Sequence, residues 1–381
     1  MVRKKKLLIT TDCFLPRWDG VTRFLVEIIP SLLRQYQITL LAPEFEGMLN
    51  EHQHPWLKRI TLVRFPLFPV QLGDIYFSNT RYSDIESHVK KADFIFNQTL
   101  GPIGFLSISA AKKHHKKLVS YVHSLEWELA TKSVKRFKIF VHLLSRFFVR
   151  RLYNQCTSLL VPTHEVLEKL TFLGVRTEKH VLSLGTDTLH YFPTSDKAAA
   201  KKNLGFSSDD FVVGFVGRLG REKDLETLWK AFRRLDKKYP NVRLLLVGVG
   251  IREVERIFAG KRHVTLAGKQ DHVVPYLQAM DVYVLPSLTE TTSLSTLEAM
   301  SCAVPVVCTP AGYVKEYVHE RVNGMLFPFH HSLMLFLKLE MLYLDPALRR
   351  KLGAAARKTI QQRFEIKKSI IQLQHMLKRF V

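Results

Sequence analysis

Cysteine is scarce in this chain, and its few copies are too scattered for a disulfide framework or a paired-cysteine metal site. The four cysteines among the 381 residues are Cys13, Cys156, Cys302 and Cys308. Metal sites built from cysteine need closely spaced pairs, and disulfide-stabilised domains carry more cysteines in a shorter chain. The spacing therefore indicates free thiols, which are typical of the reducing cytosol.

Long apolar runs are missing as well. No stretch reaches the 18 or so apolar residues that a membrane-spanning helix needs. The basic start, Met1 to Lys6, is similar to the charged region of a signal peptide, but the apolar run behind it is short and ends at Asp12. We expect a cytoplasmic chain without a transmembrane helix.

Acidic residues are few in comparison with basic ones. The chain has 57 Lys and Arg but 34 Asp and Glu, which gives a formal net charge of +23. This charge points to an anionic partner, and nucleic acid, an anionic membrane surface and phosphorylated ligands all qualify. Hydrophobic residues make up 46% of the chain, which excludes general disorder.

Clusters of metal-binding residues are also lacking in the sequence. Asp209 and Asp210 form an isolated pair before a predicted strand, as is typical of a turn. His114 and His115 lie inside a basic run, residues 112–117, whose positive charge opposes cation binding. We predict no metal site.

What the sequence does contain is an alternation of short β-branched runs and helical patterns, typical of parallel sheets in α/β domains. The length fits two domains, and there is no solenoid or propeller repeat. The strands form two Rossmann-like sets that change over near residues 185–208. They are predicted at 6–11, 38–42, 60–65, 94–97, 118–123 and 158–162, then at 212–217, 243–248, 264–267, 282–286 and 304–309.

The segment Pro286–Met300 carries two carboxylates, Glu290 and Glu298, between two apolar strands. The pattern predicts strand, loop, helix and strand, with Glu290 in the loop or at the helix start. Eight positions are about two helical turns, so the two acids would lie on nearly the same face. Because a helix N-terminus attracts anions, a carboxylate beside it suits the binding of sugar hydroxyls near a phosphate. Without this context, both acids would be ordinary helix residues.

Two cations, Arg218 and Lys223, follow an apolar strand that ends at Gly217. Ligands of open parallel sheets bind outside the carboxyl ends of the strands. Two cations there suit a diphosphate, because they stabilise the negative charge that grows as a bond to phosphate breaks. On spacing alone they could equally be solvated loop residues.

Taken together, five segments resemble the retaining glycosyltransferases of family four, which have the GT-B fold of two Rossmann-like domains facing a central cleft. The resemblance covers nearly the whole chain. It implies an acceptor-binding domain at 1–190, a nucleotide-sugar-binding domain at 191–360, and a C-terminal helix at 361–381 that crosses back to the first domain. The segments are Phe14–Val21, Tyr121–His123, Leu184–Pro193, Val216–Leu225 and Pro286–Met300.

This resemblance implies a role for each candidate residue. Arg218 and Lys223 would bind the donor diphosphate, Glu290 the donor sugar and Glu298 the ribose hydroxyls. His123 ends a predicted strand. It would hydrogen-bond a hydroxyl of the donor sugar and support the developing oxocarbenium charge through its backbone carbonyl. Outside the family context a lone histidine is more often structural.

Two segments depart from the family pattern. Thr291, Thr292 and Ser293, followed by Leu294, stand where the family has a glycine-containing stretch. Glycine lets backbone amides approach the diphosphate, whereas hydroxyl groups can donate hydrogen bonds to it. Gly20 follows an aspartate instead of a second glycine, and it can still give a tight turn near the diphosphate. We expect all five residues to bind the donor.

The expected reaction is the transfer of a hexose, glucose or mannose, from UDP-glucose or GDP-mannose to a lipid or lipid-linked acceptor. The resemblance implies retention of the anomeric configuration. Because Arg218 and Lys223 face the diphosphate, we expect no metal and no other cofactor. A soluble sugar or phosphosugar acceptor, and an epimerase or phosphorylase on the same fold, stay open as alternatives. Oligomeric state cannot be predicted.

A basic nucleic-acid-binding protein without transferase activity is another alternative. The net charge would suit it, but no RNA-binding module is recognisable, and the carboxylates and cations of the donor segments would have no purpose. We therefore expect no nucleic-acid partner.

One region predicts contact with a membrane. Residues 112–151 hold eleven Lys or Arg but two acids, Glu126 and Glu128. Residues 134–152 read as an amphipathic helix with opposite apolar and basic arcs, so the protein would be peripheral to the inner face of the cell membrane. The alternative is a core-packed helix with a solvated basic face. The apolar arc holds Phe137, Phe140, Val141, Leu144, Phe147 and Phe148; the basic arc holds the lipid contacts Lys135, Lys138, Arg146 and Arg150, with His142.

Overall fold

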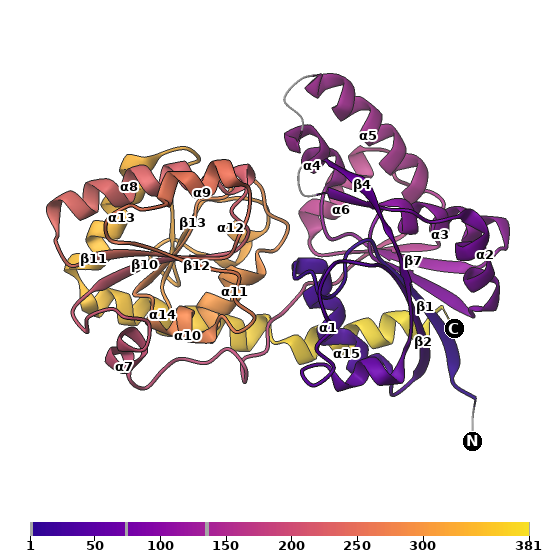
Figure 1. Ribbon diagram of the computed structural model, residues 1–381, viewed down its shortest axis with the longest axis horizontal. Helices are drawn as coiled ribbons and strands as arrows, with labels where there is room; N and C mark the ends of the chain where they lie inside the picture. The colour runs from indigo at the N-terminus through magenta and orange to yellow at the C-terminus, as the bar shows by residue number, and fades with distance from the viewer. Residues whose placement is uncertain (1–2, 73–74, 134–136, 381) are drawn as a thin grey trace. The chain divides into compact units, whose positions relative to one another are not determined.

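The computed structural model describes residues 3–72, 75–133 and 137–380. It divides the chain into two compact units (Figure 1). Unit 1 comprises Met1–Ser183 and Ile370–Val381, and unit 2 comprises Leu184–Ser369.

Unit 1 is built on a seven-stranded parallel sheet in the order β3-β2-β1-β6-β7-β8-β9, with a separate antiparallel pair, β4 and β5. The main strands are β1 (Lys5–Thr10), β2 (Tyr36–Pro43), β3 (Thr61–Phe65), β6 (Phe94–Asn97), β7 (Lys117–Tyr121), β8 (Ser158–Val161) and β9 (Lys179–Val181). The hairpin strands are β4 (Leu67–Leu72) and β5 (Ile75–Ser78).

Helices cover both faces of this sheet: α1 and α15 lie on one face, and α2 and α3 on the other (Figure 1). α15 begins in unit 2 and continues in unit 1, where Gln374 Nε2 donates to the Ser31 carbonyl at 3.3 Å. The helices of unit 1 are α1 (Gly20–Leu32), α2 (Tyr82–Lys91), α3 (Pro102–Lys113), α4 (Glu126–Ser133), α5 (Lys138–Tyr153), α6 (His164–Phe172) and α15 (Ile366–Lys378), with a 3-10 turn at Pro55–Arg59.

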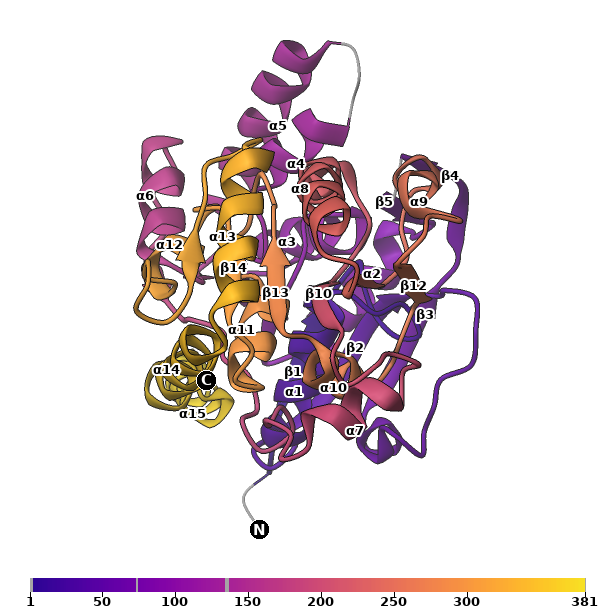
Figure 2. The same ribbon diagram turned by 90° about the vertical axis from the view of Figure 1, so that its left-hand side faces the viewer.

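Unit 2 has a six-stranded parallel sheet in the order β12-β11-β10-β13-β14-β15. Figure 2 shows β13 and β14 running side by side in the same direction. The strands are β10 (Phe211–Val216), β11 (Val242–Val247), β12 (Val264–Gly268), β13 (Val282–Leu285), β14 (Val306–Cys308) and β15 (Met325–Leu326).

In unit 2, α8 and α13 pack together on one face of the sheet, and α10 and α14 lie on the other (Figure 1). The helices are α7 (Lys197–Lys202), α8 (Leu225–Lys238), α9 (Arg252–Phe258), α10 (Val274–Ala279), α11 (Leu294–Ser301), α12 (Val314–Tyr317), α13 (Ser332–Leu344) and α14 (Pro346–Arg363), with a 3-10 turn at Arg221–Lys223.

Burial on both faces explains why the central strands are continuous apolar runs. All six residues of β10 are buried, as are all four of β13. Each of the eleven predicted strands overlaps a strand of the structure, whereas β4, β5, β9 and β15 were not expected. The two parallel Rossmann-like sheets confirm the predicted fold class.

Both sheets reverse their strand order, between β1 and β6 in unit 1 and between β10 and β13 in unit 2. Open parallel sheets bind ligands outside the carboxyl ends of the strands at such a reversal. The loops that follow these four strands are therefore the first place to look for chemistry.

The carboxyl end of β1 is tied to the start of α3 by a buried aspartate. The Asp12 carboxylate accepts hydrogen bonds from the backbone N–H of Ile103 at 2.9 Å and of Gly104 at 3.2 Å. The Thr99 hydroxyl donates to the same carboxylate at 2.6 Å. Gly104 lies so close to the Thr99 carbonyl oxygen that a Cβ would come within 1.8 Å of it.

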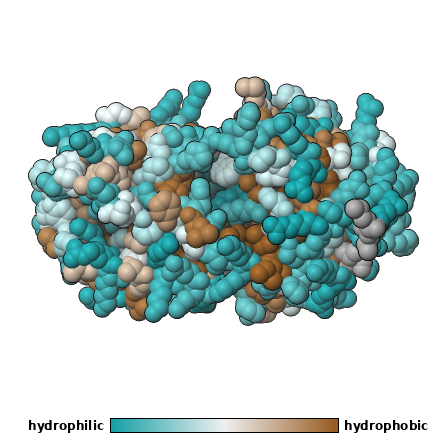
Figure 3. All heavy atoms as spheres, turned by 90° about the horizontal axis from the view of Figure 1, so that it is seen from below, coloured by the Kyte–Doolittle hydropathy of each residue, from teal (hydrophilic) through white to brown (hydrophobic). Residues whose placement is uncertain are grey.

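The polarity of the surface, the cysteines and the helix lengths agree with what the composition indicated. The face seen in Figure 3 is mostly hydrophilic, with scattered hydrophobic patches over both units. All four cysteines are free thiols. In the part of the chain that the structure describes, no helix is both long enough and apolar enough to cross a membrane.

Replacing Gly104 by alanine tests this packing. Because the new Cβ meets backbone that cannot rotate away, Gly104→Ala should destabilise the protein by about 1–3 kcal/mol. Gly20→Ala is the matched control, since a Cβ there meets nothing within 4 Å; it should change stability by less than about 0.5 kcal/mol. Urea unfolding measures both, and equal losses would contradict the account.

Candidate active site

In unit 2, the loops after β10 and β13 bring a cation and a carboxylate together. The Lys223 ammonium lies 2.6 Å from Oε1 of Glu290. Lys223 ends the 3-10 turn Arg221–Lys223, and Glu290 lies in the loop before α11. Both side chains are largely buried, so solvent screens this ion pair less than one at the surface. The structure thus places two predicted residues in direct contact, across 67 positions of sequence.

Arg218 takes a different partner. Its guanidinium lies 2.5 Å from Oε1 of Glu222, and its side chain is 43% exposed. The Glu222 backbone carbonyl also accepts a hydrogen bond from the Leu288 N–H at 2.8 Å, which joins the two loops. Sequence reasoning did not single out Glu222, although its place four residues after Arg218 is a signal for such a pair.

The loop that lacks glycine adopts a conformation that glycine would favour. Ser293, directly before α11, has φ 56° and ψ 78°, in the left-handed region. Its hydroxyl shares a 2.8 Å hydrogen bond with the Thr296 hydroxyl, which helps to offset the cost of this backbone. The Thr292 carbonyl accepts a hydrogen bond from the Tyr317 hydroxyl at 2.7 Å. Side-chain hydrogen bonds therefore stabilise a backbone conformation that glycine residues would adopt more easily.

The remaining predicted residues of this segment lie at the start of α11. Leu294 is its first residue, and Thr291 precedes it in the loop with Thr292. Glu298 lies in the second turn and is only 4% exposed, so its carboxylate is enclosed by protein. Glu290 and Glu298 therefore belong to one loop-helix segment, Glu290 in the loop and Glu298 on the helix.

A glycine that sequence reasoning missed shapes this loop. Gly312 has φ +52°, and a Cβ there would lie 1.7 Å from the Glu290 carbonyl oxygen. The backbone after β14 thus touches the backbone of Glu290 directly. A glycine followed by an aromatic residue gives no signal of this contact in the sequence alone.

In unit 1, His123 follows β7 and bonds to Gln98, which follows β6. The Gln98 amide nitrogen donates to the Phe96 carbonyl, so its oxygen faces the imidazole and accepts from His123 Nε2 at 3.0 Å. The ring packs against Phe24 and Tyr121. Burial lowers the pKa of His123 to about 3, so the imidazole is neutral and carries its proton on Nε2. Gln98 was not predicted.

Gly20 opens α1, and the residue before it caps this helix. The Asp19 carboxylate accepts a hydrogen bond from the Thr22 N–H at 2.9 Å. Its preference for the N-cap explains why aspartate stands where a glycine was expected. Gly20 and His123 belong to unit 1, and the other predicted donor-site residues belong to unit 2.

The helices observed in this region differ from the predicted membrane helix. Instead of one helix over 134–152, α4 ends at Ser133 and α5 runs from Lys138 to Tyr153. Lys138 and Arg150 are exposed, but Arg146 is half-buried beside His142, so the basic arc is not fully solvated. The core-packed alternative is wrong, because most of the apolar arc is exposed, and the contact with a membrane stays a prediction. Lys135 lies outside the described residues.

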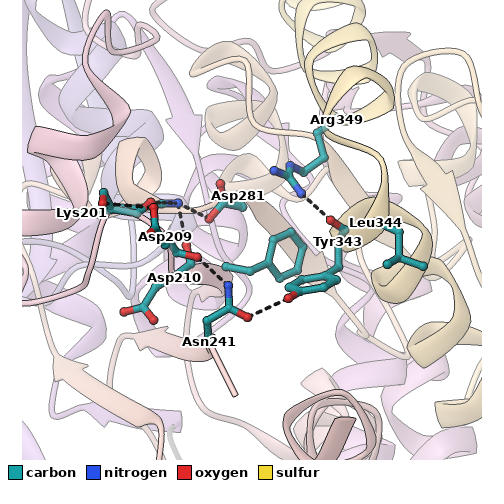
Figure 4. Close-up of a pocket in the computed structure, with 10 residues that line it drawn as sticks. Lys201, Asp209, Asp210, Asn241, Asp281, Tyr343, Leu344 and Arg349 are labelled. Atoms are coloured by element: carbon teal, nitrogen blue, oxygen red, sulfur yellow. Dashed lines mark hydrogen bonds and ion pairs between the residues drawn. The ribbon is translucent and has the colours of Figure 1, made fainter. Parts of the chain in front are cut away.

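A pocket of about 410 Å³ lies at the other edge of the unit 2 sheet, near the amino ends of β10 and β13. Figure 4 shows the Lys201 ammonium pointing to the Asp281 carboxylate, 2.8 Å away. The same ammonium donates to the Asp210 carbonyl at 2.6 Å. Protein groups therefore satisfy this buried charge, and the pocket lies apart from the loops that follow β10 and β13. Among the described residues, no cluster of three metal-ligating side chains occurs.

Two protein-family models match this chain. The model of the glycosyl transferases group 1 matches residues 196–359, and that of glycosyltransferase family 4 matches residues 18–189. The two matches together span most of the chain. The chain belongs to the group 1 glycosyltransferases.

Individual relatives are more distant. The alpha-monoglucosyldiacylglycerol synthase of Acholeplasma laidlawii is 25% identical over 64% of this chain and 65% of its own length, just under two thirds. The GDP-mannose-dependent alpha-mannosyltransferase of Corynebacterium glutamicum is 23% identical over 86% of this chain and 77% of its own. The solved structure of Anabaena HepE with UDP and glucose matches with a TM-score of 0.81, at 20% identity over 98% of this chain and 100% of that one. It supports the GT-B fold.

The low pKa of His123 has a measurable consequence. In the unfolded chain a histidine takes up a proton below its ordinary pKa of 6.5, whereas folded His123 stays neutral down to about pH 3. Between pH 7 and pH 5 this residue should therefore lower the unfolding free energy by up to about 2 kcal/mol. In the His123→Phe variant, which keeps an aromatic ring, the loss on acidification should be smaller by that amount, as urea unfolding at both pH values would measure.

Glu126 provides a control of opposite sign. Burial raises the pKa of Glu126 to about 7, so the unfolded chain ionises this group above about pH 4.5 while the folded chain does not. Its contribution to stability is present below pH 4.5 and lost as the pH rises to 7. Glu126→Gln should remove that loss. If His123→Phe and wild type lose equal stability from pH 7 to pH 5, the neutral state assigned to His123 is wrong.

Proposed function

We propose that this enzyme transfers a hexose, glucose or mannose, from a nucleotide-sugar to a lipid or lipid-linked acceptor at the cytosolic face of a membrane. The observation that carries the proposal is the ion pair of Lys223 and Glu290 outside the strand reversal of unit 2. The bond that breaks in a nucleotide-sugar joins the sugar to the diphosphate. A cation suits the diphosphate, and a neighbouring carboxylate suits the sugar hydroxyls.

The cations suit the leaving group. Arg218 and Lys223 both follow β10, and Arg218 is exposed enough to meet a ligand from solvent. As the bond between sugar and diphosphate breaks, negative charge grows on the phosphate oxygens, and fixed cations stabilise it without reorganisation. Glu290, held by Lys223, would accept a hydrogen bond from a hydroxyl of the donor sugar.

The state of His123 supports transfer with retention. An inverting reaction needs a general base that takes the proton from the acceptor hydroxyl. A histidine whose pKa is lowered to about 3, with its Nε2 proton donated to Gln98, is a poor base at neutral pH. In same-face transfer the leaving phosphate oxygen takes that proton. His123 would then position the sugar, and its backbone carbonyl would support the oxocarbenium charge.

The lipid acceptor is supported by the name of the A. laidlawii relative, a glucosyldiacylglycerol synthase, and by the net charge of +23. Anionic lipids attract basic proteins to the inner leaflet. The donor base is open, since one relative is GDP-mannose-dependent and one structural neighbour holds UDP. A soluble acceptor would be favoured if the protein stayed in solution beside anionic vesicles.

Alanine substitutions test the donor site. Arg218→Ala, Lys223→Ala and Glu290→Ala should each lower the transfer rate at least about a hundredfold, because each removes charge or positioning in the transition state. Glu298→Ala should mainly weaken donor binding. The measurement is sugar transfer from each donor with saturating acceptor, together with thermal shifts of each variant by UDP- and GDP-sugars.

Arg221→Ala is the matched control, because Arg221 lies in the same 3-10 turn but pairs with Glu253. It should retain near-normal transfer. Near-normal transfer by both Arg218→Ala and Lys223→Ala would eliminate the assigned donor site.

The mechanism makes a separate prediction. If the leaving phosphate accepts the proton and Arg218 and Lys223 neutralise the diphosphate, an α-linked donor should give an α-linked product without a divalent metal. The anomeric proton of the product, observed by NMR in an assay that contains chelator, tests both parts. A β-linked product would refute retention, and activity restored only by magnesium or manganese would refute metal independence.

A further inference from the structure

The outer side of α5 exposes an unusual concentration of large apolar side chains. Ile139 is 79% exposed, Phe140 65% and Phe147 60%. In both ribbon views α5 lies at the periphery of unit 1, packed against α4 (Figure 1 and Figure 2). The outer apolar side consists of Phe137, just before the helix, with Ile139, Phe140, Leu143, Leu144, Phe147 and Phe148.

The inner side of the same helix, which packs against α4, is partly polar. A surface helix of a protein in water normally buries its apolar side and exposes its polar side, and α5 does the opposite. His142 Nδ1 lies 3.3 Å from the Thr131 hydroxyl of α4, and Arg146 lies 3.4 Å from His142 Nε2. Val149 and Leu152 are buried at its C-terminal end. A helix that packs polar groups inward and leaves phenylalanines outside needs an apolar environment on its outer side.

The charges around this side fit a bilayer better than a protein partner. From Phe137 to Cys156 the sequence has no Asp or Glu. Lys138 begins the helix, and Arg150 and Arg151 lie in its last turn, so cations flank the apolar side chains. Sixteen residues span about 24 Å along the helix axis, and the flanking charges favour a helix lying in the membrane plane.

We propose that α5 is an interfacial helix whose outer apolar side enters the acyl region of an anionic bilayer. Lys138, Arg150 and Arg151 then meet the head-group phosphates. The main attraction is therefore hydrophobic, unlike the electrostatic docking that the basic arc indicated. The docking itself is inferred from the exposed side chains and charges of α5. Only its role, bringing the enzyme to a lipid acceptor, rests on the proposed function.

The connection of α5 to the candidate site gives this docking a role. The Tyr153 hydroxyl, at the end of α5, donates to Glu126 at 3.0 Å. Glu126 begins α4 and lies three residues beyond His123. Insertion of α5 would thus hold the carboxyl end of β7 near the bilayer surface, where a lipid presents its head group.

The test is sedimentation with vesicles of phosphatidylglycerol and phosphatidylcholine in equal parts, at about 0.1 M and about 1 M salt. The double variant Phe140→Ser and Phe147→Ser should reduce binding at least about tenfold at both salt concentrations. The double variant Lys138→Gln and Arg150→Gln should reduce binding at low salt and match wild type at high salt, where charges are screened.

The matched control removes two exposed apolar side chains from a helix of unit 2, through Leu333→Ser and Leu337→Ser on α13. It should bind vesicles as wild type does. Equal binding by wild type and the α5 phenylalanine variant would overturn the proposal, as would wild-type binding that vanishes at high salt. A dimer that this variant converts to a monomer would assign the surface to a second copy instead.

Transfer to a lipid acceptor in detergent micelles is measured separately on the same proteins. Vesicle binding without any transfer would refute the proposed function and leave the docking intact. Transfer in micelles without vesicle binding would refute the docking of α5 and leave the proposed function intact.

Discussion

The candidate site of unit 2 depends on a place where two backbones touch. At Gly312 a Cβ would lie 1.7 Å from the Glu290 carbonyl oxygen, so the loop after β14 packs against the loop after β13 without a side chain between them. On the other side, the Leu288 N–H donates to the Glu222 carbonyl in the loop after β10. The Glu290 loop is therefore held between its two neighbouring loops, and its carboxylate forms the ion pair with Lys223. Backbone packing and this largely buried ion pair together fix the position of Glu290.

Unit 1 reaches a comparable arrangement by other means. Its strand ends are fixed by polar side chains: Asp12 binds the start of α3, and Gln98 holds the His123 ring. The low pKa of His123 follows from this packing, since the ring is desolvated among Phe24 and Tyr121. In both units the groups suited to chemistry lie where the strand order reverses, as the physics of parallel sheets leads one to expect. The two Rossmann-like units thus share a topology but not the interactions that hold their loops.

The sequence predicted the central strands well because they are buried on both faces and read as unbroken apolar runs. β9 and β15 have three and two residues, too few for a pattern, and the β4–β5 hairpin follows no clean alternation. The sequence also placed Lys223 and Glu290 at one edge, since both follow apolar strands. It could not indicate Gln98 or Gly312 as partners, because each contacts a residue that only the fold brings near. Glu222 is different, because it lies four residues after Arg218, and that spacing is a signal for their ion pair. The left-handed Ser293 was hidden as well, because a serine is an unusual choice for that conformation.

α5 shows the limit of reading helices by periodicity. The pattern correctly separates an apolar arc from a basic one, but it contains no information about which arc faces the protein. Burying a leucine or phenylalanine side chain is worth about 1.5–3 kcal/mol whether a protein core or a bilayer removes it from water. In the structure, two members of the basic arc lie on the side that packs against α4: His142 contacts the Thr131 hydroxyl, and Arg146 lies beside His142. Places where the rule of apolar residues inside fails are expected to be functional. Here the exposed apolar side of α5 is connected through Tyr153 and Glu126 to the segment that carries His123. The proposed lipid-binding surface and the proposed sugar-binding strand end therefore belong to one packed structure.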